Sequence, residues 1–130
     1  MKLGATLYIK NTVDAVEFYK DAFGMNLGYN EKFPDGTFIH AELLKDGHEV
    51  FAVSESPNDA FVNVMLSSSL KESRPTMSYS INFDNEEEVR KAYSILAEGG
   101  KVLLPIGSLP WSSCCAEVVD KYGVYWYITV

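Results

Sequence analysis

The hydrophobic pattern of the chain contains one unit that occurs twice, a strand followed by an amphipathic helix. Residues 3–10 alternate between apolar and smaller or polar side chains, as expected for a half-buried strand. In residues 11–25 the apolar side chains fall on one face of a helix, and Gly24 stands where helices commonly end. Residues 76–83 alternate again, and a second amphipathic helix follows and ends at Gly99. The pattern therefore predicts two copies of one module.

Short polar residues precede both predicted helices and are candidate caps. Asn11 or Thr12 can accept hydrogen bonds from the first free amides of the first helix. Asp84 or Asn85 can do the same for the second helix, whose acidic first turn at residues 86–88 suits the positive end of the helix dipole. Both helices are thus predicted to begin through local chemistry.

Turn sequences divide the remainder of each module into strands. Pro34-Asp35-Gly36 is a strong turn signal, and Asp46-Gly47 predicts a type I′ hairpin. The predicted strands cover residues 26–33, 37–44 and 48–54 in the first module, and residues 101–106, 113–119 and 124–130 in the second. Each module then has the order strand, helix, strand, strand, strand, which predicts an α+β fold.

The length of 130 residues is that of a single domain, which can bury a core without a disulfide or a metal. We divide it into a first module at about 1–54, a linker at 55–75 and a second module at about 76–130. Within the linker, the short apolar piece at 61–66 is expected to be either an extra strand or a contact with a second subunit.

Charge and cysteine usage restrict the partners and the compartment. A net charge of −7 and a pI near 4.7 oppose binding to nucleic acid or to anionic lipid. No apolar run is long enough to span a membrane, and the N-terminus does not resemble a signal peptide. Cys114 and Cys115 are adjacent, which disfavours a disulfide between them, so we expect free thiols in a reducing, cytoplasmic setting.

Several stretches together resemble one known family, and they extend over nearly the whole chain. They are VEFYKDAFGM, FPDGTFIHAEL, EEEVRKAYSILAEGGKVLLPI, the following Trp111, and VVDKYGVYWYITV. In this order they are similar to the PhnB-like branch of the vicinal-oxygen-chelate superfamily, which includes glyoxalase I, extradiol dioxygenases and bleomycin-resistance proteins. The resemblance implies two tandem βαβββ modules that form a curled mixed sheet around a cleft, with helices outside, and a homodimer.

Relatives in this branch often carry a ubiquinone-methyltransferase label. No stretch of this chain resembles a glycine-rich turn that binds S-adenosylmethionine, so we do not carry that activity over.

If the sheets curl as the resemblance implies, strand alternation separates helix-facing from cleft-facing side chains. Ile39 and Met77 then belong to the helix-facing set, and Phe38 to the cleft-facing set. The other side chains expected to line the cleft are Thr6, Tyr8, His40, Glu42, Val50, Ala52, Ser78, Ser80, Asn82, Cys115, Glu117, Tyr125 and Tyr127. We select as ligand-binding candidates Tyr8, His40, Glu42, Ser78, Trp111, Cys115, Tyr125 and Tyr127. This mixed aromatic and hydrogen-bonding lining suits a small organic ligand.

Metal-dependent relatives hold a divalent ion with His, Glu or Gln from the first and last strand of each module. Alignment on the helices and on residues 120–123 puts Gly4 or a neighbour, Ala52, Ser78 and Tyr127 at these positions. None is a good ligand, because divalent ions in such sites need carboxylate or imidazole donors. We therefore expect no metal and no other cofactor.

A few candidate residues allow alternative interpretations. His40 and Glu42 share a strand face, so they can hydrogen-bond within the sheet, hold a ligand, transfer a proton, or form a two-residue metal site. Trp111 can stack on a flat ligand or seal one end of the core. Cys115 lacks an obvious base, which disfavours a nucleophilic role.

Three functions are consistent with these patterns, and whether the protein is an enzyme stays open. The first is a metal-free protein that binds a small planar or hydrophobic compound. The second is a lyase- or isomerase-type enzyme on a small carbonyl substrate, with His40 or Glu42 as base and tyrosine hydroxyls stabilising an oxyanion. The third is a regulatory or structural dimer whose cleft is filled.

Overall fold

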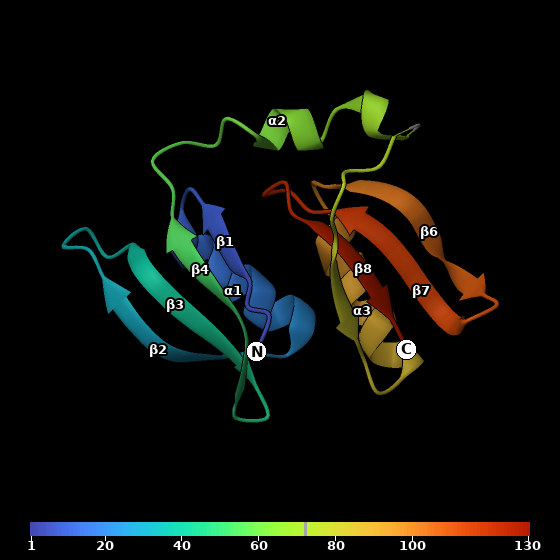
Figure 1. Ribbon diagram of the computed structural model, residues 1–130, viewed down its shortest axis with the longest axis horizontal. Helices are drawn as coiled ribbons and strands as arrows, with labels where there is room; N and C mark the ends of the chain where they lie inside the picture. The colour runs from blue at the N-terminus through green and yellow to red at the C-terminus, as the bar shows by residue number, and fades with distance from the viewer. Residues whose placement is uncertain (72) are drawn as a thin grey trace. The chain divides into compact units, whose positions relative to one another are not determined.

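The computed structural model describes residues 1–71 and 73–130, which form two compact units, Met1–Asp59 and Ala60–Val130. In chain order, the first unit contains β1 (Thr6–Ile9), α1 (Thr12–Phe23), β2 (Asn26–Lys32), β3 (Phe38–Lys45) and β4 (His48–Glu55). Its sheet has the strand order β1-β4-β3-β2, with β1 parallel to β4 and the other neighbours antiparallel (Figure 1). Helix α1 packs on one face of this sheet.

The second unit repeats this arrangement after a short helical segment. It contains α2 (Val62–Met65), the 3-10 helix η1 (Ser68–Lys71), β5 (Tyr79–Asn82), α3 (Glu86–Ala97), β6 (Lys101–Leu109), β7 (Ser112–Val119) and β8 (Tyr125–Thr129). The strand order is β5-β8-β7-β6, again with one parallel pair, β5 with β8. The predicted α+β class and the tandem βαβββ order are confirmed. Among the described residues, no helix is both long and apolar enough to cross a membrane.

Each unit has its own core between its helix and its sheet. In the first, the buried ring of Tyr19 stacks on Phe23 with centroids 6.0 Å apart and meets Phe51 edge-on at 5.5 Å. In the second, the buried stripe of α3 lies under apolar side chains of β7 and β8, among them Trp126. The indole Nε1 of Trp126 donates to the buried carboxylate of Asp120 at 2.8 Å, which ties the turn before β8 to this core.

The two helices begin in different ways, and only one matches the prediction. Asn85 caps α3 by accepting a hydrogen bond from the amide of Glu88 at 2.9 Å, as predicted. At α1 neither Asn11 nor Thr12 supplies the cap, because Asn11 has a left-handed backbone and its side chain contacts Asp14. The carboxylate of Glu55, at the end of β4, instead accepts hydrogen bonds from the backbone amides of Asn11 at 2.8 Å and Thr12 at 2.9 Å.

The predicted hairpin at Asp46-Gly47 is confirmed, whereas the predicted faces of Phe38 and Ile39 are wrong. Asp46 and Gly47 both have positive φ, as a type I′ turn requires. Phe38 is buried and Ile39 is exposed. The amide of Phe38 donates to the hydroxyl of Thr12 at 2.8 Å, and the β2–β3 ladder shifts register beside this residue, so alternation fails at the start of β3.

Two further predictions for the second half of the chain are wrong. Met77 is exposed and precedes the strand, because β5 begins at Tyr79. The apolar piece at 61–66 is not a strand but contains α2, whose turns are closed by hydrogen bonds from Met65 to Phe61 and from Leu66 to Val62. The alternative interpretation of this piece, a contact with a second subunit, stays a prediction.

Candidate functional site

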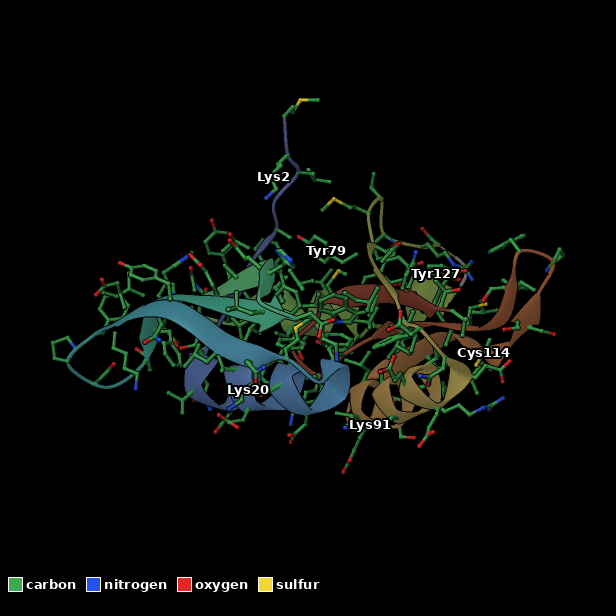
Figure 2. All side chains as sticks on the ribbon, turned by 90° about the horizontal axis from the view of Figure 1, so that it is seen from below. Lys2, Lys20, Tyr79, Lys91, Cys114 and Tyr127 are labelled. Carbon is green, nitrogen blue, oxygen red and sulfur yellow. The ribbon has the colours of Figure 1, made fainter. Side chains whose placement is uncertain are left out.

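The face of the second sheet that points away from α3 carries a row of polar side chains. On β7 and β8, Val118 pairs with Trp126 and both are buried on the helix side. Since side chains alternate along a strand, Glu117 and its register partner Tyr127 point to the other side. Figure 2 shows Tyr127 and the α3 residue Lys91 on opposite sides of this sheet. Ser80 on β5 pairs with Tyr127 and extends the row.

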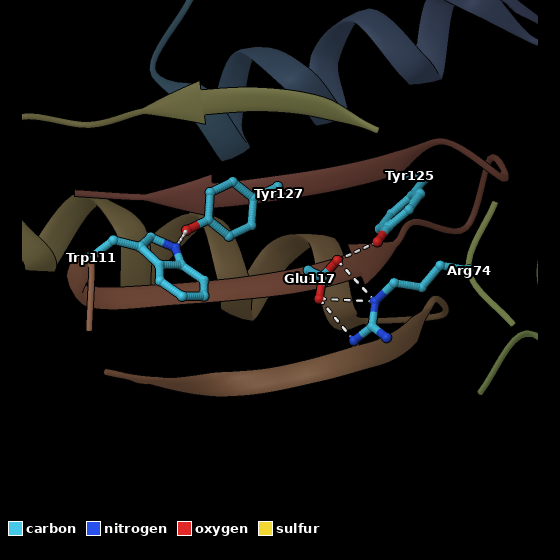
Figure 3. A network of polar contacts seen from close by, with 5 residues as sticks. All are labelled: Arg74, Trp111, Glu117, Tyr125 and Tyr127. Carbon is cyan, nitrogen blue, oxygen red and sulfur yellow. Dashed lines mark hydrogen bonds and ion pairs between the residues drawn. The ribbon is translucent and has the colours of Figure 1, made fainter. Parts of the chain in front are cut away.

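Glu117 is held by an arginine and a tyrosine (Figure 3). The guanidinium of Arg74 binds both carboxylate oxygens: its Nε lies 3.1 Å from each, and its Nη2 lies 2.9 Å from Oε2. The hydroxyl of Tyr125 donates to Oε1 of the same carboxylate. The side chain of Glu117 is 16% exposed, whereas that of Arg74 is 49% exposed. The carboxylate is therefore the inner member of this group and the guanidinium the outer one.

The electrostatics of this group keep its protons in place. Burial, followed by the hydrogen bond to Glu117, raises the pKa of Tyr125 to about 12. The hydrogen bond to Glu117 likewise raises the pKa of Arg74 above its ordinary value. Near neutral pH, Tyr125 is thus a hydrogen-bond donor and Arg74 a cation, so the group pairs one positive charge with the one negative charge of Glu117.

Trp111 lies in the hairpin between β6 and β7 and contacts the same row. Its indole Nε1 donates to the hydroxyl of Tyr127 at 3.0 Å (Figure 3). The residue is nevertheless 70% exposed, whereas Trp126 is 1% exposed. The indole is thus oriented through its polar edge while most of its surface stays open, an arrangement suited to stacking on a flat molecule.

In the first unit, the equivalent face of the sheet carries His40 and Glu42. Nε2 of His40 lies 3.0 Å from Oε2 of Glu42, and both side chains are partly exposed. On β2, Glu31 is the register partner of His40, and the ring centroid of Tyr29 lies 6.2 Å from that of His40. The imidazole therefore has a carboxylate partner that could orient it for proton transfer.

The register shows that Glu42 and Glu117 occupy equivalent positions. Thr6 and Ser80 precede the first residues of their helices, Thr12 and Glu86, by the same number of positions. From Thr6 the ladder leads across Ala52 to Glu42, and from Ser80 it leads across Tyr127 to Glu117. The repeat thus places a glutamate at the same point of each sheet, with Ala52 beside one and Tyr127 beside the other.

The structure brings some of the candidate residues together and leaves others apart. His40 is joined to Glu42, Trp111 is joined to Tyr127, and Tyr125 is joined to Glu117. The remaining candidates lie on the strands or next to them: Tyr8 is exposed on β1, Ser78 is half-buried before β5, and Cys115 is buried on β7.

Sequence reasoning placed Glu117 in the cleft wall without selecting it as a ligand-binding candidate, and it missed Arg74. A charged residue inside the otherwise apolar and small-residue stretch SSCCAEVV was a usable signal for Glu117. Arg74 gave no such signal, because it lies in the polar segment between the modules, where periodicity is absent. The two residues are 43 positions apart, and only the fold brings them together.

The residues at the expected metal positions do not fit a divalent ion. Gly4 and Ala52 have no side-chain atom that could ligate a metal. The hydroxyl of Tyr127 accepts a hydrogen bond from the indole of Trp111. In the part of the chain that the structure describes, no group of three or more His, Cys, Asp or Glu side chains is placed to hold a metal.

Comparisons with known proteins extend over nearly the whole chain. The model of the Glyoxalase/Bleomycin resistance protein/Dioxygenase superfamily matches residues 4–128. Protein YjdN of Escherichia coli is 24% identical over 136 residues, which cover 97% of this chain and 85% of that protein.

Two solved structures illustrate the likeness. One is a Bacillus cereus PhnB protein described as a putative 3-demethylubiquinone-9 3-methyltransferase; it is 28% identical, with a TM-score of 0.73 and coverage of 99% of this chain and 98% of that one. The other, from Pseudomonas aeruginosa, is 22% identical, with a TM-score of 0.73 and coverage of 99% and 96%. The predicted resemblance to the superfamily and to PhnB-like relatives is confirmed.

Proposed function

Because the chain belongs to the Glyoxalase/Bleomycin resistance protein/Dioxygenase superfamily, we propose that it binds a small, flat organic molecule on the helix-free face of its second sheet. The observation that carries the proposal is Trp111, which is 70% exposed and yet oriented by its hydrogen bond to Tyr127. Holding an exposed indole in one orientation lowers the entropy lost when a ligand stacks on it. No metal takes part in this binding.

Tryptophan fluorescence provides a direct test, because the chain has two tryptophans in opposite environments. Flat probes such as quinoline, naphthol and flavone should quench the emission of Trp111 saturably, and the non-planar cyclohexanol should not. In Trp111→Phe the remaining signal comes from buried Trp126, and the saturable response should disappear. A response of equal size in Trp111→Phe, or no response to any flat probe, would contradict the proposal.

A second candidate function is supported by the contact between His40 and Glu42. In an enzyme acting on a small carbonyl or enolisable compound, His40 would take a proton and Glu42 would hold the imidazole in place. His40→Gln separates the two functions, because it should abolish turnover in an enzyme of this kind and leave the Trp111 response to flat probes unchanged. A third reading, a dimer whose site is filled, is favoured if all flat probes fail while the protein stays folded.

The homodimer forms part of the same proposal. Phe61, which immediately precedes α2, and Val64, within α2, are exposed apolar residues. Their exposure supports a contact with a second copy at this helix. Light scattering after size-exclusion chromatography should then give twice the chain mass of 14.5 kDa, and Val64→Lys should shift the mass toward one chain. A mass of one chain at every concentration would contradict the dimer.

The metal-free and cytoplasmic assignments also stay proposals. Elemental analysis of protein purified without chelators should find no stoichiometric zinc, nickel, iron or manganese. Stoichiometric metal that is lost together with the flat-probe response on chelation would overturn the metal-free proposal. The reducing, cytoplasmic setting is supported by Cys114 and Cys115, both buried and both free.

A further inference from the structure

We propose that Glu117 anchors a guanidinium or amidinium group of the ligand, and that Arg74 occupies this anchor until such a ligand displaces it. The inference rests on the proposed function and names the chemical class of the ligand. It assigns to Arg74 an autoinhibitory role, in which a side chain of the protein stands in for a group of the ligand.

The anchor is the fixed member of the pair. Glu117 lies on β7, an inner strand between β8 and β6, and its side chain is 16% exposed. The hydroxyl of Tyr125 donates to Oε1, an oxygen that the Nε of Arg74 also binds, so the carboxylate has a second partner within the sheet. A carboxylate so far removed from water needs a partner cation, because an unpaired buried charge is costly.

Arg74 is the exchangeable member. It lies in the segment before β5, outside any helix or strand, and its side chain is 49% exposed. Because the guanidinium of Arg74 is half-exposed, water offsets part of the cost of releasing it, and a competing cation can take its place on Glu117. The Nε and Nη2 atoms of Arg74 bind the carboxylate as a fork. A planar N–C–N group reproduces this fork, whereas a single ammonium does not.

The neighbouring aromatic residues indicate what the cation would be attached to. Tyr127 is the register partner of Glu117, and directly paired side chains on one face of a sheet lie about 5 Å apart at Cβ. The hydroxyl of Tyr127 in turn holds the indole of Trp111. A ring joined to an amidinium can therefore lie against these aromatic side chains while its charged end meets Glu117. The net charge of −7 also favours a cationic ligand.

The same geometry disfavours an anionic ligand. A carboxylate or phosphate bound to Arg74 would lie beside the carboxylate of Glu117, and the two negative charges would repel each other. Moving Arg74 toward such a ligand would also leave Glu117 with only the hydroxyl of Tyr125. The arrangement thus selects against anions at the position where it could accept a planar cation.

Benzamidine is a suitable probe, because it is a flat ring bearing an amidinium, and benzamide is its uncharged isostere. Binding is measured by calorimetry with wild type, Arg74→Gln, Glu117→Gln and Arg90→Gln. Arg90 is the other arginine of the chain and pairs with Glu86 on the outer helix α3, so Arg90→Gln changes the net charge equally without touching the site. Thermal unfolding of each variant verifies that it is folded.

We expect Arg74→Gln to bind benzamidine roughly tenfold more tightly than wild type or Arg90→Gln. Without the guanidinium of Arg74, the carboxylate of Glu117 can accept charge-assisted hydrogen bonds from the amidinium. Glu117→Gln should lose this binding, and benzamide should bind all four proteins equally weakly. If Glu117→Gln does not fold, the comparison of Arg74→Gln with Arg90→Gln decides alone.

Equal affinity of Arg74→Gln and Arg90→Gln for benzamidine, or equal binding of benzamide and benzamidine to Arg74→Gln, would overturn the inference. If uncharged flat probes still quench Trp111 in that case, the proposed function survives and only the ligand class is wrong. If neither charged nor uncharged flat probes bind any of the four proteins, both proposals fail.

Discussion

The two modules share one backbone arrangement but place different side chains along the same row of their sheets. The row in the first module consists of Thr6, Ala52 and Glu42, and that in the second of Ser80, Tyr127 and Glu117. Both rows contain a glutamate at the same point, but its partner is a histidine in one module and an arginine with a tyrosine in the other. The repeat fixes where a carboxylate lies, and the residues around it determine what can bind there.

The modules also differ where their helices begin and end. Helix α1 is capped by the distant Glu55, whereas α3 is capped by the adjacent Asn85. After the left-handed Gly24 and Gly99, the first module continues with buried Met25 and the second with Gly100. One module thus has room for a large side chain at this point and the other has none.

The largest loss of stability is expected from Gly100→Ala. A Cβ at this position would lie 2.8 Å from the carbonyl oxygen of Leu96 and 3.0 Å from the Cα of Asp120, and it would also meet the carbonyl oxygen of Val119. These are backbone atoms, which cannot move without disturbing α3 and β7. We expect a loss of about 3 kcal/mol in the free energy of unfolding, measured in urea.

Gly107→Ala is the matched control for this change. At Gly107, which lies on β6, a Cβ would meet nothing closer than 4.0 Å. We expect its stability to change by about 0.5 kcal/mol or less. Equal losses in the two variants would show that Gly100 is not closely packed.

The caps should give intermediate effects that differ in their response to pH. Burial raises the pKa of Glu55, but the hydrogen bonds from Thr12 and Asn11 outweigh it, so the pKa lies below its ordinary value. The stabilisation is therefore present above the pKa of the unfolded state and is lost as pH falls through the folded pKa. At neutral pH we expect Glu55→Ala to lose about 1–2 kcal/mol and Asn85→Ala about 1 kcal/mol.

Urea unfolding of both variants between neutral and acid pH provides the measurement. The cost of Glu55→Ala relative to wild type should begin to shrink as pH falls through the ordinary glutamate pKa of about 4.3, and it should vanish only below the lower folded-state pKa, where the carboxylate is protonated in wild type too. The cost of Asn85→Ala should stay constant, since an amide does not titrate. A pH-independent cost for Glu55→Ala would contradict the assignment of a charged cap.

The smallest effect on stability near neutral pH is expected from replacing Tyr125, whose contribution changes only at alkaline pH. Its pKa of about 12 means that the folded state holds the phenol proton more tightly than the unfolded state. The associated stability is present below the ordinary pKa of about 10 and is lost as pH rises toward 12. Absorbance titration should show a late component in wild type that is missing in Tyr125→Phe and shifted to lower pH in Glu117→Gln. If Tyr125→Phe shows the same late component as wild type, the hydrogen bond from Tyr125 to Glu117 is contradicted.

Local patterns in the sequence predicted the parts of the fold that depend on neighbouring residues. The two amphipathic helices, the cap at Asn85 and the hairpin at Asp46-Gly47 follow from periodicity and turn chemistry within a few residues. The repeat of these patterns predicted the tandem modules, and the resemblance of the quoted stretches predicted the family.

Contacts between distant residues could not be predicted in this way. The cap from Glu55 to Thr12 joins residues 43 positions apart, and the hydrogen bond from Phe38 to Thr12 joins residues 26 apart. The pair of Arg74 with Glu117 is of the same kind. Except at the register shift beside Phe38, alternation identified which strand residues share a face, but it carried no information on which segment outside the sheet would supply their partners.

The central claim, that the open face beside Trp111 holds a flat ligand, is tested most directly by the two indole N–H signals in a nitrogen-15 correlation spectrum. Trp111 and Trp126 each give one such signal, and Trp111→Phe assigns them. On titration with naphthol or flavone, we expect the Trp111 signal to shift saturably while the Trp126 signal stays in place. Shifts of both signals together, or of neither at saturating probe, would contradict the account.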